Sequence, residues 1–290
     1  MSMHLGLIKP PALLDAPDVS PYHLVLCSQF RDTCEAHALY RAHYAQRLLD
    51  GHTIIVDNDA WETGRGADVT VIQEVVQSIR NYIALPGDEP PEIEVVVPDI
   101  LNDAKATLEL GVRHGQYLRE TIPNVRLVVV PQGRTWSEWS DCLAQLVDEV
   151  APDVIGVTRC VFDLPGGVPG GVVIANAWAP TTPIHLFGLS PDPAQYDGIS
   201  LLPNVRGLDT AKPATLAWAG LRFDSWLATP WLARPEFFFR LRQEMMPEGV
   251  DATTLFRYNA RALLSWLEGR GGHPHYYQGG CVCHTATTAP

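Results

Sequence analysis

The fold is decided by residues 93–133, which read IEVVVPDILNDAKATLELGVRHGQYLRETIPNVRLVVVPQG. Two valine-rich runs, 93–99 and 126–133, flank a longer segment, 104–121, whose apolar residues recur at spacings of three and four. The short runs lack the period-two alternation of a strand with one wet face, so they are typical of parallel strands buried on both faces. The spacing of the middle segment predicts an amphipathic helix. Together they indicate a strand–helix–strand unit with parallel strands.

The same alternation extends over most of the chain. Strands are predicted at 22–28, 52–57, 93–99, 126–133, 153–159, 184–188, 205–209 and 215–220. Helices are predicted between the first five strands, at 33–49, 69–83, 104–121 and 137–150. Eight parallel strands joined by helices close into a (β/α)8 barrel, the TIM-barrel architecture of the α/β class. Two further helices, at 235–246 and 253–268, are expected to pack outside it as a C-terminal helical extension.

This pattern divides the chain into four segments. A Pro-rich N-terminal arm, residues 1–20, precedes the catalytic barrel at 21–225. The C-terminal helices occupy 226–270, and an irregular tail occupies 271–290. The run LPGGVPGG after the fifth strand lacks the Lys-Ser/Thr of a phosphate-binding loop. It fits either a flexible loop over the barrel rim or a plain connector.

Composition limits the classes of function. The 290 residues carry a net charge of -12, from 21 basic and 33 acidic residues. Because affinity for phosphate backbones rests mainly on Lys and Arg, this balance counts against a pure nucleic-acid-binding module. No apolar run approaches the ~18–20 residues of a membrane helix, and the N-terminus lacks the order of a signal peptide. With six scattered cysteines and no disulfide spacing, we expect a cytoplasmic protein without membrane contact.

Polar side chains stand where the predicted strands end. Asp57, Asp99, Gln132 and Asp209 each follow a buried run, and the carboxyl ends of barrel strands share the rim that carries active sites. One such residue is most often a turn or helix cap, but four at equivalent places favour a functional site. Two carboxylates on one rim suit chemistry at a glycosidic carbon, where one attacks or stabilises the cationic centre and the other protonates the leaving group.

The segments around these residues resemble, in order, those of the tRNA-guanine transglycosylase superfamily. Asp57, Trp61 and Glu62 follow the spacing of the family's Asp-Ser-Gly-Gly-Phe-Gln segment, and Asp99 follows a proline where the family has its base-reading aspartate. VPQG at 130–133 is similar to the family's Val-Gln-Gly.

The second half of the predicted barrel extends the resemblance. HLFG at 185–188 is similar to the family's Leu-Met-Gly strand, and RGLD at 206–209 is similar to its Asp-Met-Phe-Asp nucleophile segment. Gly156 lies where a family glycine lets the backbone meet the base. His185 itself, within a predicted strand, is expected to be a core histidine with its polar atoms satisfied.

The resemblance implies base exchange without a redox or organic cofactor. Asp209 would attack C1′ and form a covalent glycosyl intermediate, while Asp57 donates a proton to the departing guanine and accepts one from an incoming 7-deazaguanine. The implied substrate-binding residues are Asp99, Gln132, Gly133, Gly156, Trp61, Glu62 and Gly188. The family's basic, zinc-bearing insertion is missing, so the chain looks more like the compact phage-type relatives that act on DNA. DNA is therefore favoured over tRNA as the partner, and the host cytoplasm is the expected location if the chain is phage-encoded.

Several alternatives stay open. Cys281, Cys283 and His284 in the tail fit either a structural zinc site or a loose polar tail. A nucleoside or glycoside hydrolase could use the same carboxylate pair on water, and a non-catalytic barrel could bind nucleic acid. The oligomeric state, including a homodimer, is open as well.

Overall fold

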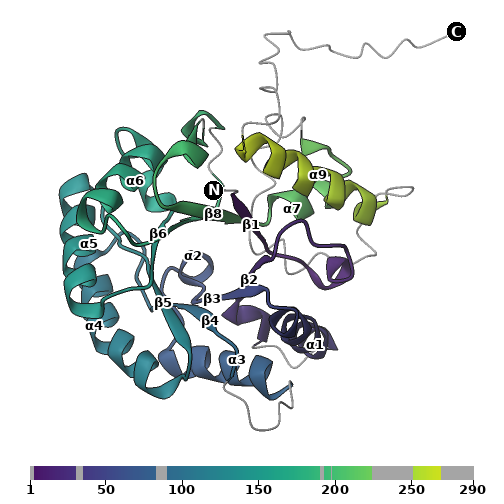
Figure 1. The fold of residues 1–290 in the computed structure, drawn as a ribbon, viewed down its shortest axis with the longest axis horizontal. Helices are drawn as coiled ribbons and strands as arrows, with labels where there is room; N and C mark the ends of the chain where they lie inside the picture. The colour runs from purple at the N-terminus through teal and green to yellow at the C-terminus, as the bar shows by residue number, and fades with distance from the viewer. Residues whose placement is uncertain are drawn as a thin grey trace, which may run out of the picture.

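The computed structural model describes residues 3–30, 35–82, 90–189, 193–196, 198–223 and 251–268. Eight parallel strands pair in chain order and close into a barrel (Figure 1). They are β1 His4–Leu7, β2 Tyr22–Leu26, β3 Thr53–Asp57, β4 Ile93–Val96, β5 Val125–Val129, β6 Val154–Val157, β7 Ile184–Phe187 and β8 Val205–Thr210. The predicted (β/α)8 barrel is confirmed.

One strand assignment is wrong. Residues 4–7 of the predicted N-terminal arm form β1, which pairs in parallel with residues 207–210 of β8 and, at Leu7, with His23 of β2. The segment predicted as the eighth strand lies instead in helix α7, Lys212–Trp218, and its last turn. Every residue of α7 is buried. An apolar run that is buried all round has the same pattern in a helix as in a strand, so periodicity could not separate the two.

Helices surround the barrel, apart from the short α2 (Ala60–Thr63), which lies over its opening (Figure 1). They are α1 Glu35–Leu49, α2 Ala60–Thr63, α3 Val69–Asn81, α4 Ala104–Thr121, α5 Trp136–Val150, α6 Gly167–Trp178, α7 and α9 Ala252–Leu267. Helix α9 confirms the helix predicted at 253–268, and it packs against α7 (Figure 1). The helix predicted at 235–246 and the tail with Cys281, Cys283 and His284 lie outside the described residues.

Side-chain caps explain where the outer helices begin. The Asp68 carboxylate accepts a hydrogen bond from the Thr70 amide at 3.0 Å, and the Asp103 carboxylate accepts one from the Ala106 amide at 3.0 Å. The Thr135 hydroxyl accepts one from Glu138 N at 3.2 Å. Each cap satisfies a backbone donor that the first helical turn leaves without a partner.

The Gly-rich run at 164–171 is neither a loop over the rim nor a plain connector. Helix α6 begins inside it, at Gly167. A Cβ at Gly171 would lie 3.0 Å from Val157 of β6, and one at Gly170 would lie 2.9 Å from the Trp136 ring. The glycines therefore let α6 pack closely on the barrel and on α5. This is a packing role that the predicted loop did not anticipate.

An ion pair crosses the N-terminal half of the barrel interior. Arg206 of β8 donates to both carboxylate oxygens of Glu94 in β4, with Nη1 2.6 Å from Oε1. In a closed barrel of eight strands, β4 and β8 stand on opposite sides. Arg126 Nη1 adds a third charge 3.3 Å from Glu94 Oε1. This end of the barrel is thus filled by paired charges.

In the described part of the chain, no helix combines the length and apolar character needed to cross a bilayer.

Candidate active site at the carboxyl rim

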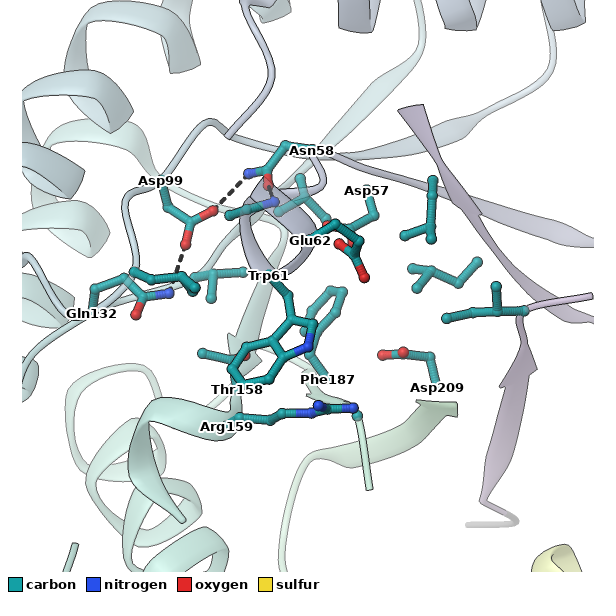
Figure 2. A pocket seen from close by; sticks show the side chains of 18 residues that line it. Asp57, Asn58, Trp61, Glu62, Asp99, Gln132, Thr158, Arg159, Phe187 and Asp209 are labelled. Carbon is teal, nitrogen blue, oxygen red and sulfur yellow. Dashed lines mark hydrogen bonds between the residues drawn. The ribbon is translucent and has the colours of Figure 1, made fainter. Parts of the chain in front are cut away.

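A pocket opens at the carboxyl ends of the strands, and Figure 2 shows the 18 side chains that line it. It holds ≈ 540 Å³ of space, the open solvent at its mouth included. Four carboxylates face it, from Asp57, Glu62, Asp99 and Asp209. Asp99 and Asp209 are buried and Asp57 and Glu62 are half-buried, so gathering these carboxyl groups in one place carries a considerable desolvation cost.

Most of the residues expected from the sequence meet in this pocket. Its lining includes Asp57, Trp61, Glu62, Asp99, Gln132, Gly188 and Asp209. Gly133 and Gly156 are not among the described residues that line it. A Cβ at Gly133 would lie 2.5 Å from the Trp139 amide nitrogen, and one at Gly156 would lie 2.7 Å from the Phe187 ring. These two glycines make room for α5 and for the Phe187 ring in the barrel interior. That either of them also contacts a base stays a prediction.

The turn after β3 places Trp61 and Glu62. Asp59 adopts the left-handed conformation, with φ of 60°, and its carboxylate accepts a hydrogen bond from the Ser28 amide at 2.5 Å. Ala60 N donates to the Asn58 amide oxygen at 2.9 Å. These bonds start the short helix α2 at Ala60, three residues after Asp57, so its single turn carries Trp61 and Glu62 over the pocket.

Asp99 anchors a buried polar corner on one side of the pocket. Its Oδ1 accepts from Asn58 Nδ2 at 2.7 Å and its Oδ2 accepts from Gln132 Nε2 at 2.6 Å (Figure 2). The Gln132 amide oxygen accepts from the Asn102 amide at 3.1 Å. Burial raises the pKa of Asp99 to about 6, against the two amide donors that lower it. The corner is held in place before any ligand arrives, and Asn58 is a member of it that the sequence interpretation did not include.

The other three carboxyl groups titrate far above their ordinary range. Burial, with the neighbouring charges of Glu62 and Asp59, raises the pKa of Asp57 well above that of a free carboxyl. Burial also raises the pKa of Glu62 to about 7. It raises the pKa of Asp209 to about 7, against the nearby charge of Arg159 and a backbone hydrogen bond from Gly188. Near neutral pH the group therefore offers both a protonated acid and an ionised carboxylate.

Several buried polar atoms in and below the pocket lack partners. Within the described residues, Glu62 Oε2, Asp209 Oδ1 and both ring nitrogens of His185 accept or donate no hydrogen bond. His185 Nε2 lies 3.3 Å from Asp209 Oδ1, and burial holds the pKa of His185 well below its usual value. His185 is buried in the core, as predicted, but the prediction that its polar atoms are satisfied is wrong. Buried polar atoms are normally paired, so a convergent unpaired set indicates a ligand site.

Arg159 is a second pocket residue that the sequence interpretation did not include. It begins a 3-10 turn after β6, and its guanidinium carbon lies 4.3 Å from the centroid of the Trp61 ring. A Cβ at Gly188 would lie 2.7 Å from Arg159 Nε, so the glycine leaves room for this side chain. The available signal was position, because Arg159 follows a buried strand at the same rim as the carboxylates.

Two groups of described side chains could offer ligands to a metal ion. Oxygens of Asp57, Asp59 and Glu62 lie within 4.8 Å of one another, as do ligand atoms of Asp18, His23 and His52. In the first group Asp59 is already hydrogen-bonded to Ser28. In the second, Asp18 is bound by Lys9 at 2.5 Å and by Arg47 at 2.8 Å. Both aspartates are therefore already bound to protein donors, so neither group is well suited to hold a metal ion.

Comparison with protein-family models and curated proteins found no match. The chemistry of the protein is therefore inferred from the geometry, the charges and the unpaired atoms of the site.

Proposed function

We propose that the chain is a transglycosylase that exchanges guanine in nucleic acid, with DNA favoured over tRNA, for a free 7-deazaguanine base. One observation carries the proposal: buried and half-buried carboxyl groups with pKa values raised to the neutral range converge on one pocket at the barrel rim, and Asp209 presents an oxygen without a hydrogen-bond partner. Such a set supplies a nucleophile and an acid together, as displacement at a glycosidic carbon requires.

The exchange proceeds through two displacements at C1′. Ionised Asp209 attacks C1′ as the bond to guanine breaks, and Asp57 protonates the departing base. The incoming 7-deazaguanine then displaces Asp209 from C1′, and Asp57 takes up the proton that this base loses. Two inversions retain the configuration of the sugar. Glu62, with its pKa raised to about 7, stands beside Asp57 as a second proton store.

The polar corner suits the edge of a guanine-like base. Asp99 and Gln132 offer carboxylate and amide groups whose positions are fixed by mutual hydrogen bonds, and Trp61, 43% exposed, offers a ring face at the mouth. The target nucleotide must leave its helix to reach this rim, as in other base-modifying enzymes.

The choice of partner follows from the resemblance. The segments similar to those of tRNA-guanine transglycosylases occur in family order, and no basic zinc-bearing insertion interrupts them. This supports DNA as the substrate. The scattered cysteines support the cytoplasm as the place of action, that of the host if the chain is phage-encoded. The proposed chemistry requires no cofactor.

Replacing Asp209 by Asn tests the proposal. Removing a covalent nucleophile should lower incorporation of labelled guanine into DNA by about a thousandfold or more. A covalent adduct between enzyme and DNA on a denaturing gel should disappear with it. Asp148→Asn on the exposed face of α5 makes the same change of charge and should leave both signals intact. Turnover of Asp209→Asn at the wild-type rate would contradict the assignment of the nucleophile.

Hydrolysis is the second candidate. The unpartnered Oε2 of Glu62 and the open mouth of the pocket favour it, because a carboxylate with a pKa of about 7 could activate water. The same assay separates the two reactions. A hydrolase releases guanine from DNA or from nucleosides without incorporating the labelled base, whereas a transglycosylase incorporates it.

A further inference from the structure

Arg159 faces the pocket as a cation without an anion of its own. Its side chain lines the pocket and is largely buried. Within the described ranges of the chain, its guanidinium makes no salt bridge within 4.0 Å and donates no hydrogen bond. Asp209 and Glu62 lie close enough to act on it only through longer-range attraction. A guanidinium cannot lose its proton in a protein, so its five N–H donors remain to be satisfied.

The Trp61 ring determines how those donors are presented. The guanidinium carbon stands 4.3 Å from the ring centroid, so one face of the cation is covered by the indole. Stacking of this kind fixes the guanidinium while leaving its N–H edge available. The edge of a guanidinium matches the spacing of two oxygens on a carboxylate or a phosphate. The pair therefore forms a preset anion site.

The anion belongs on the sugar side of the pocket. In Figure 2 the Arg159 guanidinium ends toward Asp209, while Asp99 and Gln132 lie on the other side. Its charge acts on Asp209 and on Lys212, which is buried three residues after Asp209. In barrel enzymes, phosphate groups are often bound around the ends of the seventh and eighth strands, which here end next to Gly188 and at Thr210. A substituent on the base would instead lie toward the Asp99 corner.

We propose that Arg159 binds a phosphate of the target nucleotide, next to the sugar that Asp209 attacks. The site would then take phosphorylated nucleotide units, and not free nucleosides. This inference rests on the proposed function, because Asp209 is taken to mark the position of C1′.

Equilibrium binding tests the inference without turnover. The probe is a short, fluorescein-labelled single-stranded DNA with one guanine, prepared with natural phosphates or with a neutral methylphosphonate on the 5′ or the 3′ side of that guanosine. Wild type should lose about tenfold to a hundredfold in affinity for one of the two methylphosphonate strands, as for a lost charged hydrogen bond. In Arg159→Gln the natural strand should bind that much more weakly, and the methylphosphonate should bring no further loss. The salt dependence should fall by about 0.7 in log–log slope, for one phosphate contact.

Control variants separate the bidentate geometry of the guanidinium from its charge. Arg159→Lys keeps the charge without the two-pronged edge and should recover the salt slope but only part of the affinity. Arg113→Gln, on the exposed face of α4, makes the same change of net charge and should bind like wild type. A methylphosphonate penalty of equal size in Arg159→Gln and wild type would overturn the inference.

Mononucleotides identify the source of the phosphate. Deoxyguanosine 5′- or 3′-monophosphate should displace the labelled strand from wild type and fail to displace it from Arg159→Gln if Arg159 also binds the phosphate of free nucleotides. If neither strands nor mononucleotides bind better than deoxyguanosine, the inference is wrong. Loss of base exchange with phosphate-dependent binding intact would instead count against the proposed function alone.

Discussion

The two ends of the barrel interior treat buried carboxylates in opposite ways. At the N-terminal end, Glu94 is held by both prongs of Arg206 and by Arg126. At the C-terminal end, Asp209 keeps an unpartnered oxygen and has its pKa raised to about 7. Arg206 and Asp209 lie only three residues apart on β8, so one strand serves both ends.

The difference separates stability from reactivity. A buried charge that is fully paired is costly to disturb but has no free lone pair to offer. A buried carboxylate with an unpartnered oxygen is destabilising, and for the same reason that oxygen is ready to accept a proton or attack a carbon. Breaking the Glu94–Arg206 pair should therefore lower the free energy of unfolding, whereas neutralising Asp209 should raise it at a pH where its carboxylate is ionised.

The largest effect on stability is expected from Glu94→Gln. It leaves Arg206 buried without its counter-ion and should lower the free energy of unfolding by about 3–5 kcal/mol. Glu92→Gln is the matched control, because Glu92 is 62% exposed and only 3.5 Å from Arg126. That change should cost about 1 kcal/mol or less. Urea denaturation measures the free energy of unfolding of both variants. Equal losses would contradict the interpretation that the buried Glu94–Arg206 pair stabilises the N-terminal end of the barrel.

Asp209→Asn should reduce the pH dependence of stability. The pKa of Asp209 is raised from 3.8 to about 7 in the folded protein, so the folded state binds more protons than the unfolded state between these values. The resulting stabilisation is present below about pH 4 and is lost as pH rises through 7. At about 1.4 kcal/mol per pKa unit it amounts to a few kcal/mol at most.

The measurement is the urea midpoint at pH 5 and pH 8. Relative to wild type, Asp209→Asn should gain more at pH 8 than at pH 5, since it removes a carboxylate that is ionised at the higher pH. Asp57, Glu62 and Asp99 have raised pKa values of the same sign, so some pH dependence should remain. Asp148→Asn should leave the wild-type difference unchanged. Identical pH dependence in Asp209→Asn and wild type would rule out the proposed shift.

The smallest effect, and the finest test of the open end, is that of Gly188→Ala. Gly188 has φ of +79°, and an added Cβ would lie 2.7 Å from Arg159 Nε. The backbone strain alone costs about 1–2 kcal/mol, and the shift of Arg159 should weaken DNA binding severalfold. Gly115→Ala places a Cβ 2.7 Å from Val150 on the outer helices and should leave DNA binding unaltered. Fluorescence anisotropy with the natural strand compares the two, and unchanged binding in Gly188→Ala would separate Gly188 from the anion site.

The sequence anticipated the rim better than the closure of the barrel. Asp57, Asp99, Gln132 and Asp209 could be assigned to one pocket because each follows a buried parallel strand, and the ends of such strands coincide. Strand β1 escaped prediction because four residues among prolines give no period to recognise. Gly133 and Gly156 are closely packed, and the sequence alone does not say whether a glycine is required for packing, for binding or for both.

The chain's own pattern of apolar runs and helical spacing determined the parallel α/β class, the outer helices and the row of polar residues at the strand ends, because these are properties of consecutive residues. Only the tertiary structure decided that residues 4–7 close the barrel and that Arg159 stacks on Trp61. It also decided that both carboxylate oxygens of Glu94 are paired while Asp209 keeps one oxygen without a partner. These depend on which segments far apart in sequence meet, and on how much water is excluded where they do. Burial and pairing set the pKa of a carboxylate, and neither can be read from its neighbours along the chain.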